Sequence, residues 1–321
     1  MPRATGSVLH VTNGDSVAVP LRQTGLEGDS FAWRDVYHEG PVRSGERSRM
    51  IDARAAFLAS CGWGDEATVR SELLARDAHF VDALRDGREI VLWFEHDLYD
   101  QLQLTDVLAL AGETGFDPEQ LELIEIGSFP GRPGFRGLGE LNPAQLEALW
   151  PQRRAVTDED TAGAQLAWEA LRRGDPRGIA EVHRDPPTVR PFLGAVFGRL
   201  LEELPGVKDG LSRTERQLLR LLADGPLLTG ALFEASQDLE DAPFHGDAWV
   251  VRALEGLEGA TPLVSLTDGS AAITDAGSRV LAGEADRVEL LGIDRWVGGT
   301  HVRPGAVWRW DGGSSELVAP M

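Results

Sequence analysis

Short apolar runs and helical spacings alternate along the first half of the chain. Helical spacing is the recurrence of apolar residues every three or four positions. The short β-rich runs predict strands at 7–13, 28–36, 88–97 and 121–131. The segments between them predict helices at 17–25, at 47–85 with a break at 62–65, and at 98–115. This order predicts a mostly parallel, Rossmann-like α/β sheet with helices on both faces.

Two details sharpen these predictions. The run IVLWF within 88–97 is continuously apolar, as expected for a strand covered by helices on both faces. In the helix at 17–25, Pro20 is expected in the first turn, where its missing N–H costs little, and Gly25 is expected to end the helix. Residues 131–145 are rich in glycine and proline and predict a loop.

The second half of the chain is predominantly helical. Helices are predicted at 157–176, 188–206, 211–226, 227–237 and 244–259, then a two-stranded ribbon at 261–277, a closing helix and a hairpin within 292–311. Three helices followed by a ribbon are typical of a winged helix. We therefore expect an α/β ligand-binding domain at 1–145, a helical connector at 146–209 and a winged-helix-like module with its terminal hairpin at 210–311.

Composition narrows the classes of function. The 321 residues include 52 acidic and 31 basic side chains, for a net charge of −21, which disfavours DNA as a partner. The third helix of the expected module carries Asp247, Glu255 and Glu258 against Arg252, a poor set for reading DNA. No apolar run is long enough for a membrane span. The single cysteine, Cys61, excludes an intramolecular disulfide, and we expect a cytoplasmic protein.

Ligands of open parallel sheets bind at the carboxyl ends of the strands, so the residues that follow each strand are the first candidates. After the first strand come Asn13, Gly14, Asp15 and Ser16. A glycine followed by a helix N-terminus suits an anion. The alternative is that Asp15 or Ser16 only caps the helix. The segment matches neither a dinucleotide-binding fingerprint nor a P-loop.

The second strand is followed by Arg34, His38 and Glu39. Arg34 offers a bidentate guanidinium to a phosphate or carboxylate, and His38, tuned by Glu39 or Asp35, is a candidate general acid or base. The alternative is a surface ion pair of Arg34 with Asp35 and a histidine that only hydrogen-bonds the turn.

The third strand leads directly into Glu95, His96, Asp97, Asp100 and Gln101. Ionisable groups are costly beside a buried strand unless they bind something or cap the next helix. We expect Glu95 and Gln101 to contact the ligand. If the protein is an enzyme, His38, Glu39, His96, Asp97 and Asp100 are the catalytic candidates, with Asp97 or Asp100 orienting His38 or holding Mg²⁺. Asp97 as a helix cap is the alternative.

The loop after the fourth strand contains Ser128, Arg132 and Arg136 among several glycines. Arginines in a glycine-rich loop suit a mobile segment that grips an anion. We expect Ser128 and Arg132 to contact the ligand; the alternative is a solvated linker.

Three of these blocks, LHVTNGDSVA (9–18), WRDVYHEGPV (33–42) and LWFEHDLYDQLQL (92–104), resemble a bacterial family catalogued only as domain of unknown function 1835. The segment GIDRWVGGTHV (292–302) resembles the C-terminal region that often accompanies this domain. The resemblance implies that the three blocks belong together, and it names no substrate.

The leading hypothesis is a protein that binds a small anionic, phosphate-bearing or nucleotide-like ligand at the strand ends, with hydrolysis or group transfer as the reaction if it is an enzyme. The first alternative is a ligand-sensing transcriptional regulator that uses the winged-helix module. The second is a structural protein in which that module forms a homodimer interface.

Overall fold

The computed structural model describes residues 8–117 and 119–320. These residues form two compact units. The first consists of the chain up to residue 196 together with 298–300, and the second consists of 197–297 and 301–320. The first unit contains every residue that the sequence singles out as a ligand or catalytic candidate.

A five-stranded sheet forms the centre of the first unit, in the order β2-β1-β3-β4-β5. The first four strands are parallel, and the short β5 pairs with β4 in the antiparallel direction. The predicted mostly parallel α/β sheet is therefore confirmed. The strands are β1 (Leu9–Thr12), β2 (Asp29–Ala32), β3 (Ile90–Glu95), β4 (Leu121–Ile126) and β5 (Arg154–Ala155).

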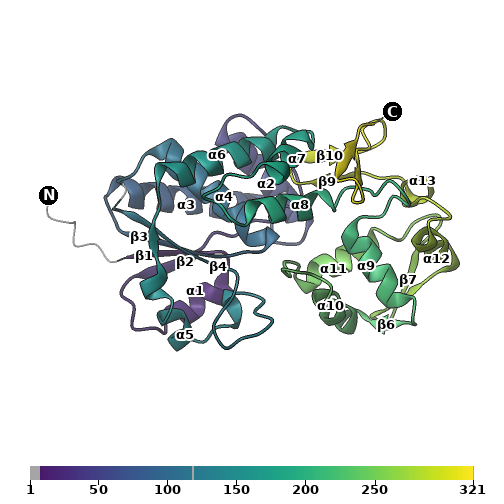
Figure 1. The fold of residues 1–321 in the computed structure, drawn as a ribbon, viewed down its shortest axis with the longest axis horizontal. Helices are drawn as coiled ribbons and strands as arrows, with labels where there is room; N and C mark the ends of the chain where they lie inside the picture. The colour runs from purple at the N-terminus through teal and green to yellow at the C-terminus, as the bar shows by residue number, and fades with distance from the viewer. Residues whose placement is uncertain (1–7, 118, 321) are drawn as a thin grey trace. The chain divides into compact units, whose positions relative to one another are not determined.

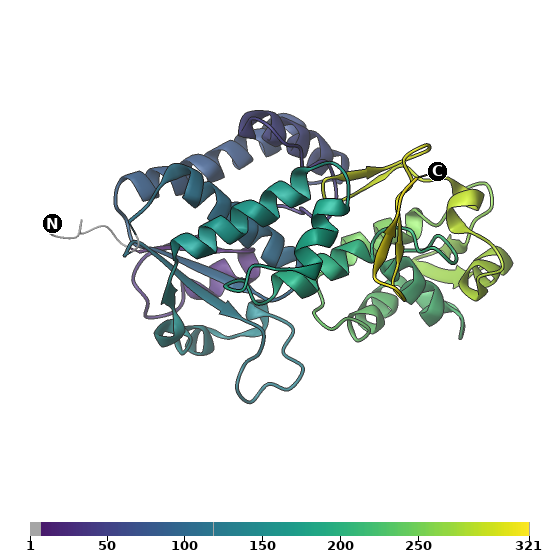
Figure 2. The same cartoon turned by 45° about the horizontal axis from the view of Figure 1, so that its top comes forward.

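Helices cover both faces of this sheet, as Figures 1 and 2 show. Side chains of β3 alternate between the two layers. Leu92 packs against helices α3 and α4, whereas Trp93 packs against α1 and α5. Every residue of β3 is buried, as its continuous apolar run predicts. The helices of this unit are α1 (Asp15–Leu21), α2 (Arg47–Ser60), α3 (Glu66–Arg85), α4 (Leu98–Thr114), α5 (Pro143–Glu147), α6 (Asp158–Arg172) and α7 (Arg177–Arg184).

Local sequence signals explain several helix boundaries. Asp65 caps α3 by accepting from the Thr68 N–H at 3.0 Å, and Thr157 caps α6 in a reciprocal capping box with Asp160. Pro143 is the first residue of α5, where its missing N–H leaves no hydrogen bond unmade. These features agree with the predicted break at 62–65 and with the predicted start of the helix at 157.

Two helices differ from their predictions. Helix α1 begins at Asp15 rather than 17, so Pro20 lies near its end, and the helix stops at Leu21 instead of Gly25. A proline inside a helix removes one N–H donor and clashes with the preceding turn, which limits α1 to a short element. The predicted helix at 188–206 is shorter, α8 (Leu193–Leu201), because Pro191 disfavours helical backbone at Arg190. The expected helical connector also contains α7, which includes His183.

The described residues of the second unit form several helices and a small antiparallel sheet in the order β6-β8-β7. Ser212 and Glu215 form the predicted capping box of α9. A turn at Asp268-Gly269 joins β7 to β8, as predicted. The elements are α9 (Arg213–Leu222), β6 (Leu227–Leu228), α10 (Thr229–Gln237), α11 (Asp247–Glu255), β7 (Val264–Thr267), β8 (Ser270–Ile273), α12 (Asp275–Ala282) and α13 (Arg287–Leu291).

The C-terminal segment forms two strand pairs where one hairpin was predicted. Strand β9 (Arg295–Val297) pairs with β10 (Thr300–Val302), and β11 (Arg309–Asp311) pairs with β12 (Glu316–Val318). None of the helices formed by the described residues has both the length and the apolar character that crossing a lipid bilayer requires.

Candidate functional site

Three buried carboxyl groups lie together where β3 ends and α4 begins. Glu95 is the last residue of β3, Asp97 is the N-cap of α4, and Asp100 lies in the first turn of that helix. Their exposed fractions are 6%, 3% and 0%. One carboxylate oxygen from each lies within 4.8 Å of the other two. We call Glu95, Asp97 and Asp100 the acidic cluster.

Backbone hydrogen bonds in the turn bring the acidic cluster together. The Asp97 side chain accepts from the Asp100 N–H at 2.9 Å, which caps α4. Oδ1 of Asp100 accepts from the Glu95 N–H at 2.9 Å, which ties the helix back to the end of the strand. The sharp passage from strand to helix therefore leaves all three carboxyl groups facing one small region.

Asn13, which follows β1, completes this arrangement from the neighbouring strand. Its Nδ2 donates to Oδ2 of Asp100 at 2.5 Å, and the side chain is only 7% exposed. Its Oδ1 is buried and makes no hydrogen bond within the described chain. A buried amide oxygen without a donor is costly unless a ligand or an ion completes it.

The backbone of residues 137–138 closes over the acidic cluster. The Leu138 N–H donates to the Glu95 carboxylate, and Leu138 is fully buried. A Cβ atom added at Gly137 would lie 2.7 Å from Cδ of Glu95, so only glycine allows this approach. This segment must shift for any ligand to reach the three carboxyl groups.

Burial raises the pKa of each carboxyl group in the cluster, and neighbouring negative charge adds to this for Glu95 and Asp100. Burial, followed by the charges of Asp100 and Asp97, holds the pKa of Glu95 well above its ordinary value. Burial, and then the charge of Asp97, acts in the same direction on the pKa of Asp100. Burial raises the pKa of Asp97 to about 7. Without a cation, the cluster therefore retains protons at neutral pH.

Gln101 connects the acidic cluster to a buried arginine that sequence analysis missed. Its Nε2 donates to the Glu95 carbonyl at 2.7 Å and to Glu125 at 2.9 Å. Its Oε1 accepts from Arg190 at 2.9 Å. Arg190 is fully buried and pairs with Glu125 at 3.2 Å, so its charge does not directly neutralise the cluster. A lone arginine in the apolar stretch 188–197 was the available signal.

Arg34 and Asp15 lie apart from the acidic cluster. They form an ion pair with each other, and about half of each side chain is exposed, 52% for Arg34 and 53% for Asp15. Ser16 is also exposed. Gly14 is the N-cap of α1 and, because it has no side chain, offers no side-chain hydrogen bond to the first turn of the helix. Of the residues that follow β1, Asn13 therefore contacts the acidic cluster, whereas Asp15 pairs with Arg34 instead.

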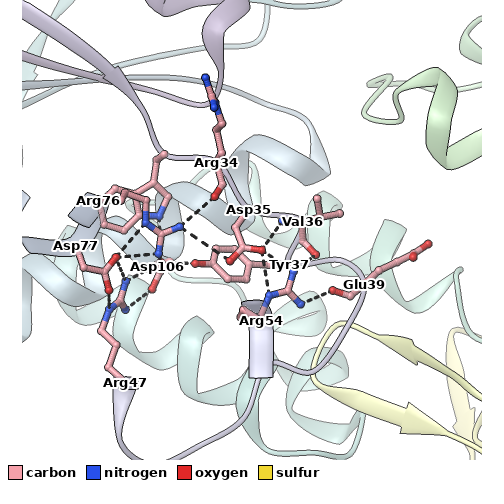
Figure 3. Close-up of polar contacts among 11 residues, drawn as sticks. Arg34, Asp35, Val36, Tyr37, Glu39, Arg47, Arg54, Arg76, Asp77 and Asp106 are labelled. Atoms are coloured by element: carbon pink, nitrogen blue, oxygen red, sulfur yellow. Dashed lines mark hydrogen bonds and ion pairs between the residues drawn. The ribbon is translucent and has the colours of Figure 1, made fainter. Parts of the chain in front are cut away.

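The residues after β2 form a buried network of ion pairs instead of an open site (Figure 3). Asp35 accepts from Nη2 of Arg54 at 2.5 Å, and both side chains are 1% exposed. Figure 3 shows the Arg34 side chain extending away from this network, whereas its backbone carbonyl accepts from Arg76 at 3.1 Å. Further hydrogen bonds and ion pairs within the network join three arginines to three aspartates. The arginines are Arg47, Arg54 and Arg76, and the aspartates are Asp35, Asp77 and Asp106.

Glu39 contributes to this network through its backbone. Its carbonyl accepts from Nη1 of Arg54 at 2.6 Å, and its carboxylate points away from the network in Figure 3. His38 is buried, with its ring edge-on to Tyr99 at 6.4 Å between centroids, and its carbonyl accepts from the Gly298 N–H at 2.8 Å. These contacts join the 38–39 turn to its surroundings through two backbone carbonyls and the His38 ring.

The remaining candidates lie on the periphery of the cluster. His96 is half-buried against the Phe192 ring at 5.8 Å, and burial lowers its pKa. Ser128 is exposed, and Arg132 lies 3.6 Å from Glu140 across its own loop. Arg136 is half-buried, and its N–H donates to Glu140 at 3.3 Å. Arg132 therefore pairs within its own loop in this structure.

Comparison with known proteins adds no identification. No protein-family model matches the chain, and a search of curated proteins finds no match. The resemblance stated from the three polar blocks stays a prediction, and the site has to be interpreted from its own chemistry.

Proposed function

We propose that the protein binds a small phosphate-bearing ligand through a divalent cation held at the carboxyl ends of β1 and β3. The observation that carries the proposal is the acidic cluster itself, three buried carboxyl groups within 4.8 Å of one another. Asn13 adds an independent observation, because its buried Oδ1 makes no hydrogen bond within the described chain. Together they offer four side chains with oxygen donors around one small region.

Charge favours a cation over a direct anion contact. Three carboxylates would repel a phosphate, and within the described chain no arginine or lysine pairs with them. Carboxylate and amide oxygens are the ligands that Mg²⁺ and Mn²⁺ prefer. Mg²⁺ in particular usually combines one or two carboxylates with phosphate oxygens of its substrate. The cation thus explains how an acidic site accepts an anionic ligand.

Access requires the cover over the cluster to move. The Leu138 N–H donates to the Glu95 carboxylate in the closed form. A cation bound to Glu95 would compete with this hydrogen bond and release the 137–138 segment. The loop between β4 and α5 then acts as the cover whose opening admits the cation and the phosphate.

The test compares two helix caps with the same local role. Asp97 caps α4 and Asp65 caps α3, each accepting an N–H three residues ahead. Asparagine caps helices about as well as aspartate, so Asp97→Asn and Asp65→Asn both preserve the cap. We expect titration calorimetry to detect Mn²⁺ binding in the natural chain and in Asp65→Asn, and its loss in Asp97→Asn. Equal affinity in all three proteins would refute the cation site.

A second titration tests the anion. Pyrophosphate is the probe, added to the natural chain with and without saturating Mn²⁺. We expect saturable pyrophosphate binding only when Mn²⁺ is present, and none for Asp97→Asn in either condition. Binding of Mn²⁺ without any binding of pyrophosphate would leave a cation site and refute the phosphate-bearing ligand.

For the second unit, we infer a winged-helix-like module. Its support is the order α9-β6-α10-α11-β7-β8, with β6 pairing to β8. The charge of α11 argues against a DNA reader, because Asp247 and Glu255 are exposed on the helix that would enter the groove. We therefore propose that this module does not bind DNA. Salt-sensitive binding of the full chain to duplex DNA would contradict that proposal and favour the regulator.

A further inference from the structure

A cavity lies in the first unit, at the outer edge of the sheet. Strand β2 is the edge strand, and the cavity beside it is also lined by α2, α3 and the turn between them. Its volume is about 620 Å³, within the range of small-molecule sites. None of Glu95, Asp97 and Asp100 lines it. A ligand here would not depend on the proposed cation site.

Aromatic side chains form one part of the cavity wall. The Phe31 and His79 rings meet edge to face, with centroids 5.0 Å apart. Trp63 is 40% exposed, although tryptophan is usually well buried. The flanking glycines, Gly62 at φ 85° and Gly64 at φ 139°, allow the sharp turn that presents this indole. Such walls suit a flat aromatic ring, which packs on other rings edge to face or stacked.

Three guanidinium groups line the cavity, and because Arg76 is already bonded to Asp77, Arg22 and Arg34 are the two that can supply positive charge to a ligand. Arg22 donates to the side chain and carbonyl of Ser30 at 3.0 and 2.9 Å, and Arg34 donates to Asp15 through Nη2. Each guanidinium has five N–H donors, so both have further donors for a ligand. The pair of Arg34 with Asp15 is half exposed, and solvent screening leaves exposed ion pairs only weakly favourable. A ligand anion can therefore compete with Asp15 for Arg34.

We propose that this cavity binds a small aromatic anion, with its ring against Phe31, His79 and Trp63 and its acidic group at Arg34 and Arg22. The acidic group is a carboxylate, sulfonate or phosphate, since a guanidinium recognises all three by the same charge-assisted hydrogen bonds.

The probe for this site is anilinonaphthalene sulfonate, an aromatic anion whose fluorescence rises when its rings leave water. Phenylnaphthylamine, which has the same rings and no acidic group, is its neutral counterpart. Two substitutions in the full-length chain test the cavity. Arg34→Ala removes the charge, and Ala75→Phe fills the cavity from an exposed position on α3.

Matched controls lie on α3. Arg70 forms an exposed ion pair with Asp52, like the pair of Arg34 with Asp15, but does not line the cavity, so Arg70→Ala is the control for charge. Ala78 is exposed on α3 outside the cavity, so Ala78→Phe is the control for bulk. Circular dichroism of every variant verifies that the fold is intact.

We expect saturable binding of the sulfonate to the natural chain and to both controls. Binding should weaken about tenfold in Arg34→Ala, the usual effect of losing one charge-assisted hydrogen bond, and should be abolished in Ala75→Phe. Phenylnaphthylamine should bind more weakly and should not respond to Arg34→Ala. Sulfonate binding that is the same in Ala75→Phe and Ala78→Phe would overturn the site. A neutral probe as sensitive to Arg34→Ala as the sulfonate would overturn the anion preference.

Discussion

Asn13 donates from Nδ2 to Oδ2 of Asp100 at 2.5 Å, across 87 positions of sequence. This bond joins the carboxyl ends of β1 and β3, two adjacent parallel strands. It holds a fourth oxygen-bearing side chain against the three carboxyl groups of the acidic cluster. The relationship has consequences for stability that can be measured without knowing the ligand.

Replacing Asn13 should lower stability in the absence of a cation, and the response to a cation should depend on whether the new side chain carries a carboxyl group. Asn13→Ala leaves Asp100 without its donor and should lower the free energy of unfolding by about 1–3 kcal/mol, measured by urea denaturation. Asn13→Asp adds a fourth carboxyl group, so we expect a similar loss without metal and a larger stabilisation by Mn²⁺ than in the natural chain. A Mn²⁺ response that is equal in Asn13→Asp and Asn13→Ala would argue against Asn13 as a ligand.

The raised pKa of Asp97 predicts how stability varies with pH. Its pKa is about 7 in the folded chain, against an ordinary value of 3.8. The folded state therefore retains a proton that the unfolded state releases, and the free energy of unfolding falls as pH rises from about 4 to 7. A shift of this size corresponds to at most about 4 kcal/mol. In urea denaturation at several pH values, Asp97→Asn should show a flatter profile, and Mn²⁺ should stabilise the natural chain most at the upper end.

Sequence alone predicted the local part of this site better than its distant partners. Asp97 and Asp100 follow a continuously apolar strand, so a helix cap and a polar strand end could both be inferred from neighbouring residues. It was harder to predict which of two adjacent residues is buried. Arg34 and Asp35 are neighbours, yet Arg34 is exposed and Asp35 is buried against Arg54. Composition cannot say which of two adjacent charges faces inward, because this depends on where the facing helix presents an opposite charge.

Arg190 shows the same limit of sequence-based prediction for residues that lie far apart in the chain. Its partner Gln101 lies 89 positions away in the sequence, and no local pattern links the two. The four parallel strands and most helices of the first unit were predictable because their apolar spacing is a local property, whereas the short β5 was not predicted. The closure of residues 137–138 over Glu95 could not be predicted, because it depends on the path of a loop whose sequence indicates only irregular structure.

The pair of Asp35 and Arg54 should be far more sensitive to substitution than an exposed pair. Arg54→Met would leave the Asp35 carboxylate buried without its main partner, and breaking a buried pair in this way costs about 3–5 kcal/mol. Arg70→Met breaks the exposed pair with Asp52 and should cost less than about 1 kcal/mol. Urea denaturation of both variants provides the comparison. Similar losses in the two would mean that the buried network contributes no more than surface charge.

Substitution of Gly137 tests the close approach of the cover to the acidic cluster. Its φ of 165° is extended and open to any residue, so the nearest obstacle to Gly137→Ala is the Glu95 carboxyl group. We expect a loss of about 1–3 kcal/mol in the free energy of unfolding, because overpacking forces the side chain or the backbone to move. Gly230→Ala is the control, since a Cβ atom there meets open space within α10, and it should be neutral or slightly stabilising.

In a Glu95→Ala background the cost of Gly137→Ala should largely disappear, as a double-mutant cycle would show. A cost that persists in that background would place the obstacle elsewhere in the 137–138 segment.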